Sequence, residues 1–315
     1  MALSKKEPFP SNVRKDIMTF GKGDILSFEF FPPRNIQEFS LLEESCKLLA
    51  PYNPTFISFT DGAGGSKNRD IIDAVRIVRK YLKAEIVAHI TSCDKEEEDI
   101  DNIVSLYLDE KIDSFLIIRG DCPTNEFLMD LDDLEEQINK GFNHASDLIS
   151  YLSNKELNKI GFGAFPAGHP EDKKREDTIE TFRLKVEAGG TFSATQLFFD
   201  ADEYVSFYEE IRKFDSATPI YAGIMPLVSL RQAERFAEIC DITLPKDLIE
   251  GFTACTNKEE ERDFGLRYIA SLCDSLIQQN ADGLHFYTLN RSTAFIEIAK
   301  KMKRLNLEER KEIGK

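Results

Sequence analysis

The feature of this sequence that most limits its fold is a regular alternation of short apolar segments with longer amphipathic ones. Segments that read as strands cover 25–31, 55–60, 85–91, 114–120, 159–165, 192–199, 219–225 and 283–289. Amphipathic stretches that predict helices cover 38–50, 70–82, 96–108, 144–152, 173–188, 201–214, 230–240 and 258–280, and a closing helix is predicted over 292–302. Eight strand–helix units in series predict an α/β fold, the (β/α)8 TIM barrel.

The main alternative is an open doubly wound sheet of the Rossmann type. No G-x-G-x-x-G phosphate fingerprint follows the first strand segment, which disfavours that alternative. We therefore predict a polar N-terminal extension over 1–24 and a single barrel domain over 25–315. The stretches 124–141 and 241–256 are predicted to be irregular insertions, either lids or plain surface loops.

Composition excludes several classes of protein. The chain has 315 residues, and its net charge of -16 argues against nucleic acid or an anionic membrane as a partner. No run approaches 18 apolar residues, and no signal-peptide core is present, so we expect a cytoplasmic protein. The six cysteines form no C-x-x-C pair, which favours reduced thiols, and the four histidines lack metal-ligand spacing, so no metal is expected.

A glutamate inside the first apolar segment is the first candidate for chemistry. Because side chains alternate along a strand, Ser27, Glu29 and Phe31 share one face, and Phe28 and Phe30 share the other. A carboxylate placed among phenylalanines is expected to have a raised pKa, and a glutamate that is partly protonated near neutral pH can act as a general acid. The alternative is an edge-strand glutamate that faces water.

Polar residues gather where the predicted strands end. Active sites of (β/α)8 barrels lie at the carboxyl ends of the strands, so these residues are predicted to meet at one rim. They are Glu29, Arg34, Thr60, Asp61, His89, Thr91, Arg119, Asp121, His169, Gln196, His285, Tyr287, Asn290 and Arg291. His89 and His285 could each be a core histidine or a ligand contact. Arg119 and Asp121 could form a structural ion pair or part of a site. The glycine-rich loop 62–65 could be a simple turn or a loop that binds phosphate.

Several motifs, taken together and in this order, resemble methylenetetrahydrofolate reductases over roughly residues 25–291. The most specific are Ser-Phe-Glu-Phe-Phe-Pro-Pro-Arg (27–34) and Gly-Leu-His-Phe-Tyr-Thr-Leu-Asn-Arg (283–291). Others are Ile-Ser-Phe-Thr-Asp-Gly-Ala-Gly (57–64), Ala-His-Ile-Thr (88–91), Ile-Arg-Gly-Asp (118–121), Phe-Pro-Ala-Gly-His-Pro-Glu (165–171), Thr-Gln-Leu-Phe-Phe-Asp (195–200) and Gly-Ile-Met-Pro (223–226).

The resemblance implies a (β/α)8 barrel that holds FAD without a covalent bond and reduces 5,10-methylenetetrahydrofolate to 5-methyltetrahydrofolate, with NADH or NADPH as electron donor. It implies that Glu29 is the proton donor and that the charge of Asp121 stabilises a cationic intermediate. Gln196, Arg291 and Thr60 fall on substrate-binding positions. The positions implied to contact the cofactor are Thr60, Ala63, His89, Arg119, Gly120, Asp121, His144, Ala145, Phe165, His169 and Lys185. Members of the family are often homo-oligomers.

This sequence departs from the family pattern at five positions. Asp61 and Leu230 stand where members carry aromatics, His144 and Phe165 stand where tyrosines are common, and Thr178 replaces an aspartate seven residues before Lys185. Two alternatives therefore stay open beside the reductase. One is a flavin barrel that receives electrons from a partner subunit instead of free NAD(P)H, and the other is a non-catalytic folate-binding barrel.

Overall fold

Eight parallel strands close into a barrel in a computed structural model that describes residues 25–61, 68–93, 95–120, 141–170 and 172–302. The strands follow each other around the barrel in chain order, and the first pairs with the last. They are β1 (Ile25–Phe30), β2 (Phe56–Phe59), β3 (Glu85–Thr91), β4 (Ser114–Ile118), β5 (Ile160–Ala164), β6 (Phe192–Thr195), β7 (Ile220–Ile224) and β8 (Gly283–Tyr287). The predicted (β/α)8 TIM barrel is confirmed.

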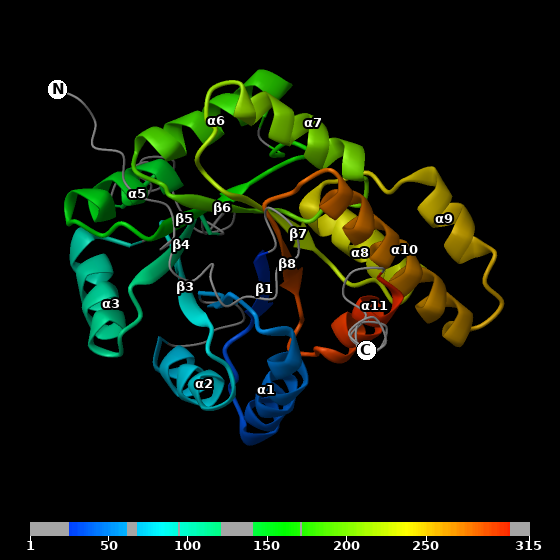
Figure 1. Cartoon of the computed structure of the whole chain (residues 1–315). Helices are drawn as coiled ribbons and strands as arrows, with labels where there is room; N and C mark the ends of the chain where they lie inside the picture. The colour runs from blue at the N-terminus through cyan, green and yellow to red at the C-terminus, as the bar shows by residue number, and fades with distance from the viewer. Residues whose placement is uncertain (1–24, 62–67, 94, 121–140, 171, 303–315) are drawn as a thin grey trace, which may run out of the picture.

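Helices surround the strands as an outer layer (Figure 1). They are α1 (Ile36–Leu49), α2 (Asn68–Tyr81), α3 (Glu97–Asp109), α5 (Ala145–Asn154), α6 (Arg175–Glu187), α7 (Ala201–Arg212), α8 (Leu230–Cys240), α9 (Lys246–Thr253), α10 (Lys258–Gln278) and α11 (Thr293–Lys301), with a short 3-10 helix η2 (Ala50–Tyr52). None of those in the described ranges is of a length and apolarity that would let it cross a bilayer.

Two predictions about the chain need correction. The segment 241–256 is not irregular throughout, because α9 occupies its middle and buries Leu248 and Phe252. Cys93 is disulfide-bonded, so the prediction of reduced thiols is wrong there, although Cys46, Cys240, Cys255 and Cys273 are free. The predicted extension 1–24, most of the insertion 124–141 and the loop 62–65 lie outside the described residues.

An aromatic cluster between the barrel and its helices uses the outward face of β1. Phe28 packs edge-on against Phe295 of α11, with ring centroids 4.6 Å apart, and also lies beside Phe286 of β8. Tyr52 of η2 contacts the same Phe295 ring at 5.0 Å. Burying a side chain of this size stabilises the fold by about 1.5–3 kcal/mol. The phenylalanines of the first strand therefore hold the helix layer in place.

The interior of the barrel changes character along its axis. Its amino-terminal half is filled by a set of apolar side chains, which includes Phe56, Phe192 and Tyr221 in mutual ring contact. The strand register places Ser27 level with Phe56 and Glu29 level with Ser58, so polar side chains begin at the level of this plug and continue toward the carboxyl ends of the strands. The aromatic plug closes the lower end, and the polar layer faces the carboxyl rim.

Candidate active site

Glu29 lies inside the barrel between two histidines. Its Oε2 atom is 3.4 Å from Nε2 of His89 on β3 and 3.6 Å from Nε2 of His285 on β8. The Glu29 side chain is 16% exposed, whereas both histidine side chains are almost fully buried. Because the barrel is closed, β1 has no free edge, and the alternative of an edge-strand glutamate in water is wrong.

The pKa of Glu29 is lowered, which corrects the raised pKa expected from the sequence. Burial acts to raise it, but the close approach of His285 and the charges of His89 and His285 outweigh that effect. The phenylalanines do not surround this carboxylate, because Phe28 and Phe30 point into the helix layer. Burial lowers the pKa of His89 despite the opposing charge of Glu29.

Three predicted substrate residues follow strands that end at this rim. Thr60 comes directly after β2, and its Oγ1 is buried without a hydrogen-bond partner in the described part of the chain. Gln196 comes directly after β6, and its Oε1 accepts a hydrogen bond from the backbone of Leu197 at 2.9 Å. Arg291 follows β8 with an exposed side chain. The structure thus brings all three to the end of the barrel toward which Glu29 lies.

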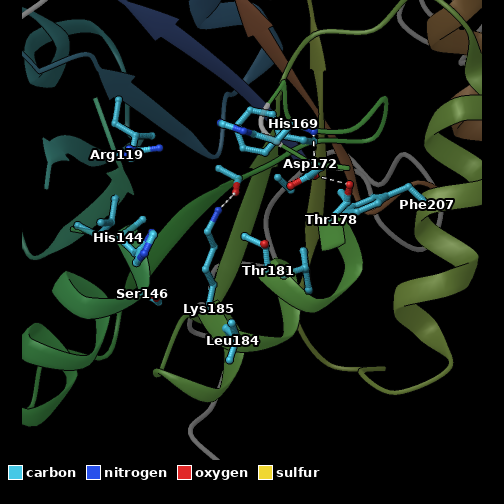
Figure 2. A pocket seen from close by; sticks show the side chains of 17 residues that line it. Arg119, His144, Ser146, His169, Asp172, Thr178, Thr181, Leu184, Lys185 and Phe207 are labelled. Carbon is cyan, nitrogen blue, oxygen red and sulfur yellow. Dashed lines mark hydrogen bonds between the residues drawn. The ribbon is translucent and has the colours of Figure 1, made fainter. Parts of the chain in front are cut away.

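A cavity of about 380 Å³ lies beside the rim, between β4, β5, α5 and α6. Six predicted cofactor residues line it, namely Arg119, His144, Ala145, Phe165, His169 and Lys185. Figure 2 shows Arg119 and His144 on one side and His169 and Asp172 on the other, with Lys185 between them. Thr60, His89 and Gly120 are not among its lining residues. Ala63 and Asp121 lie outside the described residues.

Lys185 is the buried cation of this cavity. It lies on α6 and donates a hydrogen bond to the carbonyl oxygen of Gly163 at 2.9 Å, and its ammonium group is 5.6 Å from the Phe165 ring centroid. Burial lowers its pKa to about 8, although the charge of Asp172 acts in the opposite direction. A desolvated ammonium group with one carbonyl partner has donors left for an anion such as a phosphate.

Gly120 shows why the Arg-Gly-Asp segment carries a glycine. Its φ of +79° lies in the left-handed region, and a Cβ atom there would stand 2.8 Å from Cγ2 of Thr91. The backbone after β4 therefore passes close to the end of β3, and a larger residue would displace one of the two.

The sequence model of the methylenetetrahydrofolate reductase family matches residues 15–303. The chain belongs to this family. Among curated relatives, the 5,10-methylenetetrahydrofolate reductase of Buchnera aphidicola is 27% identical over 276 residues, covering 86% of this chain and 89% of that protein. The Escherichia coli reductase is 27% identical, with coverage of 85% and 86%. The prediction of an enzyme of this family is confirmed.

Two further comparisons differ in how much of the other protein this chain covers. Methylenetetrahydrofolate reductase (NADH) 1 of Arabidopsis thaliana is 28% identical over 86% of this chain, which spans 47% of the plant protein. A solved Clostridium thermocellum protein, described as binding two copies of 5-methyl-5,6,7,8-tetrahydrofolic acid, superposes with a TM-score of 0.59 over 90% of this chain and 96% of that chain. At 12% identity, this likeness concerns the fold alone.

The structure accounts for the missing family aspartate at Thr178. The Thr178 hydroxyl donates to Oδ2 of Asp172 at 2.5 Å, and the same oxygen accepts from the backbone of His169 at 3.0 Å. Asp172 lines the cavity, whereas Asp177 instead accepts from the backbone of Lys173. Asp172 was not among the residues predicted from the sequence. The signal available was a carboxylate three residues after His169, in a turn.

The other departures are accommodated locally. Asp61, in place of an aromatic, accepts hydrogen bonds from the backbone and hydroxyl of Thr91 and pairs with Lys95 at 3.1 Å. Although burial acts to raise the pKa of Asp61, these contacts lower it. Phe165 meets the His169 ring edge-on at 4.7 Å, and Leu230 is half-buried at the start of α8.

Proposed function

We propose that this protein reduces 5,10-methylenetetrahydrofolate to 5-methyltetrahydrofolate with bound FAD and a pyridine nucleotide, and that Glu29 is the proton donor. The family membership supports the reaction. The observation that carries the residue assignment is a carboxylate held inside the barrel by His89 and His285. A separate cavity between β4, β5, α5 and α6 offers the cations Arg119 and Lys185.

The lining of the cavity fits part of FAD, in particular its diphosphate and a ribose. A cavity of about 380 Å³ lies within the range of ligand pockets. Lys185 and Arg119 suit the diphosphate, and Asp172 offers a carboxylate oxygen to a ribose hydroxyl. When bound, FAD would supply the hydride that ends on the one-carbon unit of the folate. The residues of the chain must then hold the folate, exclude water and deliver one proton.

Glu29 would deliver that proton to the amine nitrogen that leaves the bridging carbon. Because its pKa is lowered, the carboxylate is ionised in the empty site and must first take up the proton. Its Oε2–H bond breaks and a new N–H bond forms, so the five-membered ring opens to an iminium cation. Thr60, Gln196 and Arg291 would hold the folate at the rim. We assign to Asp121 the stabilisation of the cation, by the attraction of a carboxylate for developing positive charge.

The proposal and its nearest alternative differ in the electron donor. A relative named as an NADH enzyme supports a free pyridine nucleotide. Leu230, at the start of α8, stands in place of a stacking aromatic and leaves open the alternative of a barrel that receives electrons from a partner subunit.

The experiment is a flavin spectrum of the purified protein, followed by anaerobic titration with NADH and with NADPH separately. We expect a yellow protein that either nucleotide bleaches and that methylenetetrahydrofolate reoxidises. Oxidation of a reduced viologen dye by the folate, without bleaching by either nucleotide, would favour the partner-fed enzyme. A colourless protein that FAD cannot reconstitute would support the non-catalytic barrel and refute the proposal.

A further inference from the structure

The carboxylate of Glu29 has a neighbour that can store a proton. The Nδ1 atom of His285 is 2.8 Å from Oγ of Ser27, and the Nε2 atom of the same ring faces Oε2 of Glu29 at 3.6 Å. Ser27 and His285 are paired residues of β1 and β8 and are both fully buried. The three side chains therefore form a row inside the barrel, with the imidazole in the middle.

The Ser27 hydroxyl has two acceptors within reach. It is 3.3 Å from the carbonyl oxygen of Leu284, to which it can donate, and 2.8 Å from Nδ1 of His285. When Nδ1 carries a lone pair, the hydroxyl can donate to it. When Nδ1 carries a proton, the hydroxyl can donate its own hydrogen to the Leu284 carbonyl, and its oxygen can accept a hydrogen bond from Nδ1–H. His285 can thus be neutral or doubly protonated without leaving Nδ1 unsatisfied in the interior.

We propose that His285, with Ser27 as its hydroxyl switch, is the positioning residue that loads the proton onto Glu29. This inference rests on the proposed function of Glu29. After the Oε2–H bond of Glu29 breaks and the folate N–H bond forms, the Nε2–H bond of His285 breaks and Oε2–H forms again. His285 is left neutral, with its remaining proton on Nδ1 donated to Ser27.

Other groups near Glu29 are less suited to this task. His89 approaches the carboxylate from β3, but in the described part of the chain it has no hydroxyl partner like Ser27, and burial lowers its pKa. Tyr287 of β8 uses its hydroxyl to donate to the carbonyl of Thr195. Asp61 acts on His89 through its charge and is itself bound to Lys95.

The test compares Ser27→Ala with Ser58→Ala. Ser58 lies opposite Glu29 in the strand register, and its buried hydroxyl has no hydrogen-bond partner in the described residues, so it is a matched control. The protein is labelled with 15N-histidine, and the ring-nitrogen signals of His285, assigned with His285→Gln, are followed by NMR as pH changes. Loss of the Ser27 oxygen costs the doubly protonated ring more than the neutral one, because hydrogen bonds to charged groups are stronger.

We expect the midpoint of the His285 protonation change to fall by about one pH unit in Ser27→Ala and to stay in place in Ser58→Ala. The alkaline limb of folate reduction, where the protonated His285 is lost, should move with it. Equal midpoints in the two variants would overturn the proposal. If Ser27→Ala does not fold, Glu29→Gln serves instead, since an unchanged His285 midpoint in that variant would also overturn it. The NMR result does not require reductase activity, so inactive protein with the expected midpoints would refute only the proposed function.

Discussion

The side chain of Asn290 closes on the backbone of Phe31 with both of its polar atoms. The Phe31 N–H donates to Oδ1 at 2.8 Å, and Nδ2 donates to the Phe31 carbonyl at 3.1 Å. Two residues earlier, the Thr288 hydroxyl donates to the carbonyl of Glu29 at 2.7 Å. The segment after β8 therefore fixes the backbone at the proposed proton donor and two residues after it. Leu289 and Asn290 both have positive φ values, a strain of about 1–3 kcal/mol per residue that these contacts must offset.

Replacing Asn290 with alanine should loosen the end of β1. Two backbone groups of Phe31 lose their partner, so we expect the free energy of unfolding to fall by about 1–3 kcal/mol in urea titration. Folate reduction should fall more than flavin reduction by the donor, because Glu29 shifts. Asn290→Asp is the matched control. It keeps the Oδ1 acceptor, so its stability should lie between that of the parent and that of the alanine variant. An alanine variant as stable and as active as the parent would show that the contacts of Asn290 with Phe31 are dispensable.

Glu29→Gln keeps the size of the side chain and removes the proton. We expect flavin binding and flavin reduction by the donor to stay near the parent values, while the rate of folate reduction falls about 10²–10⁴-fold, the usual contribution of a general acid. Stopped-flow absorbance of the two half-reactions measures both. Folate reduction at the parent rate would show that another group donates the proton.

Lys185 should make cofactor affinity depend on pH. Its pKa of about 8 in the folded chain lies below the value of 10.5 for an exposed lysine, so the folded protein binds fewer protons between these values. The stability of the empty protein should therefore rise with pH across this window. FAD affinity should instead fall above about pH 8, because an uncharged amine attracts the diphosphate less. Flavin fluorescence titrations at several pH values measure this, and Lys185→Met should bind weakly with a flat profile. A parent profile as flat as that of the variant would contradict the role.

Asp172 should support the cofactor in place of the missing family aspartate. Asp172→Asn keeps the shape of the side chain but removes the negative charge of the carboxylate, whose Oδ2 accepts hydrogen bonds from Thr178 and from the backbone of His169. We expect FAD to bind several-fold more weakly by fluorescence titration, with the melting temperature of the empty protein little changed. Asp177→Asn, on the same segment but outside the cavity lining, is the control. Equal losses in both variants would mean that Asp172 has no special part.

The barrel could be predicted from the sequence because each strand–helix unit has its own apolar pattern, and closure needs no further information. Alternation along β1 separated Glu29 from Phe28 and Phe30, but only the closed barrel shows that its face turns inward. Its pKa did not, because the two histidines beside it come from β3 and β8, far along the chain. Asp172 was missed for a similar reason, since its partner Thr178 reaches it only once α6 has formed. Local patterns predict elements, and contacts across elements set the chemistry.

The aromatic plug of Phe56, Phe192 and Tyr221 limits how substrates can reach the interior of the barrel. With the amino-terminal end of the barrel closed, both substrates of the proposed reaction, and every proton exchanged with solvent, would have to enter through the carboxyl rim. We therefore expect the two substrates to take turns, each one leaving before the other arrives, so that an excess of either inhibits the reaction of its counterpart.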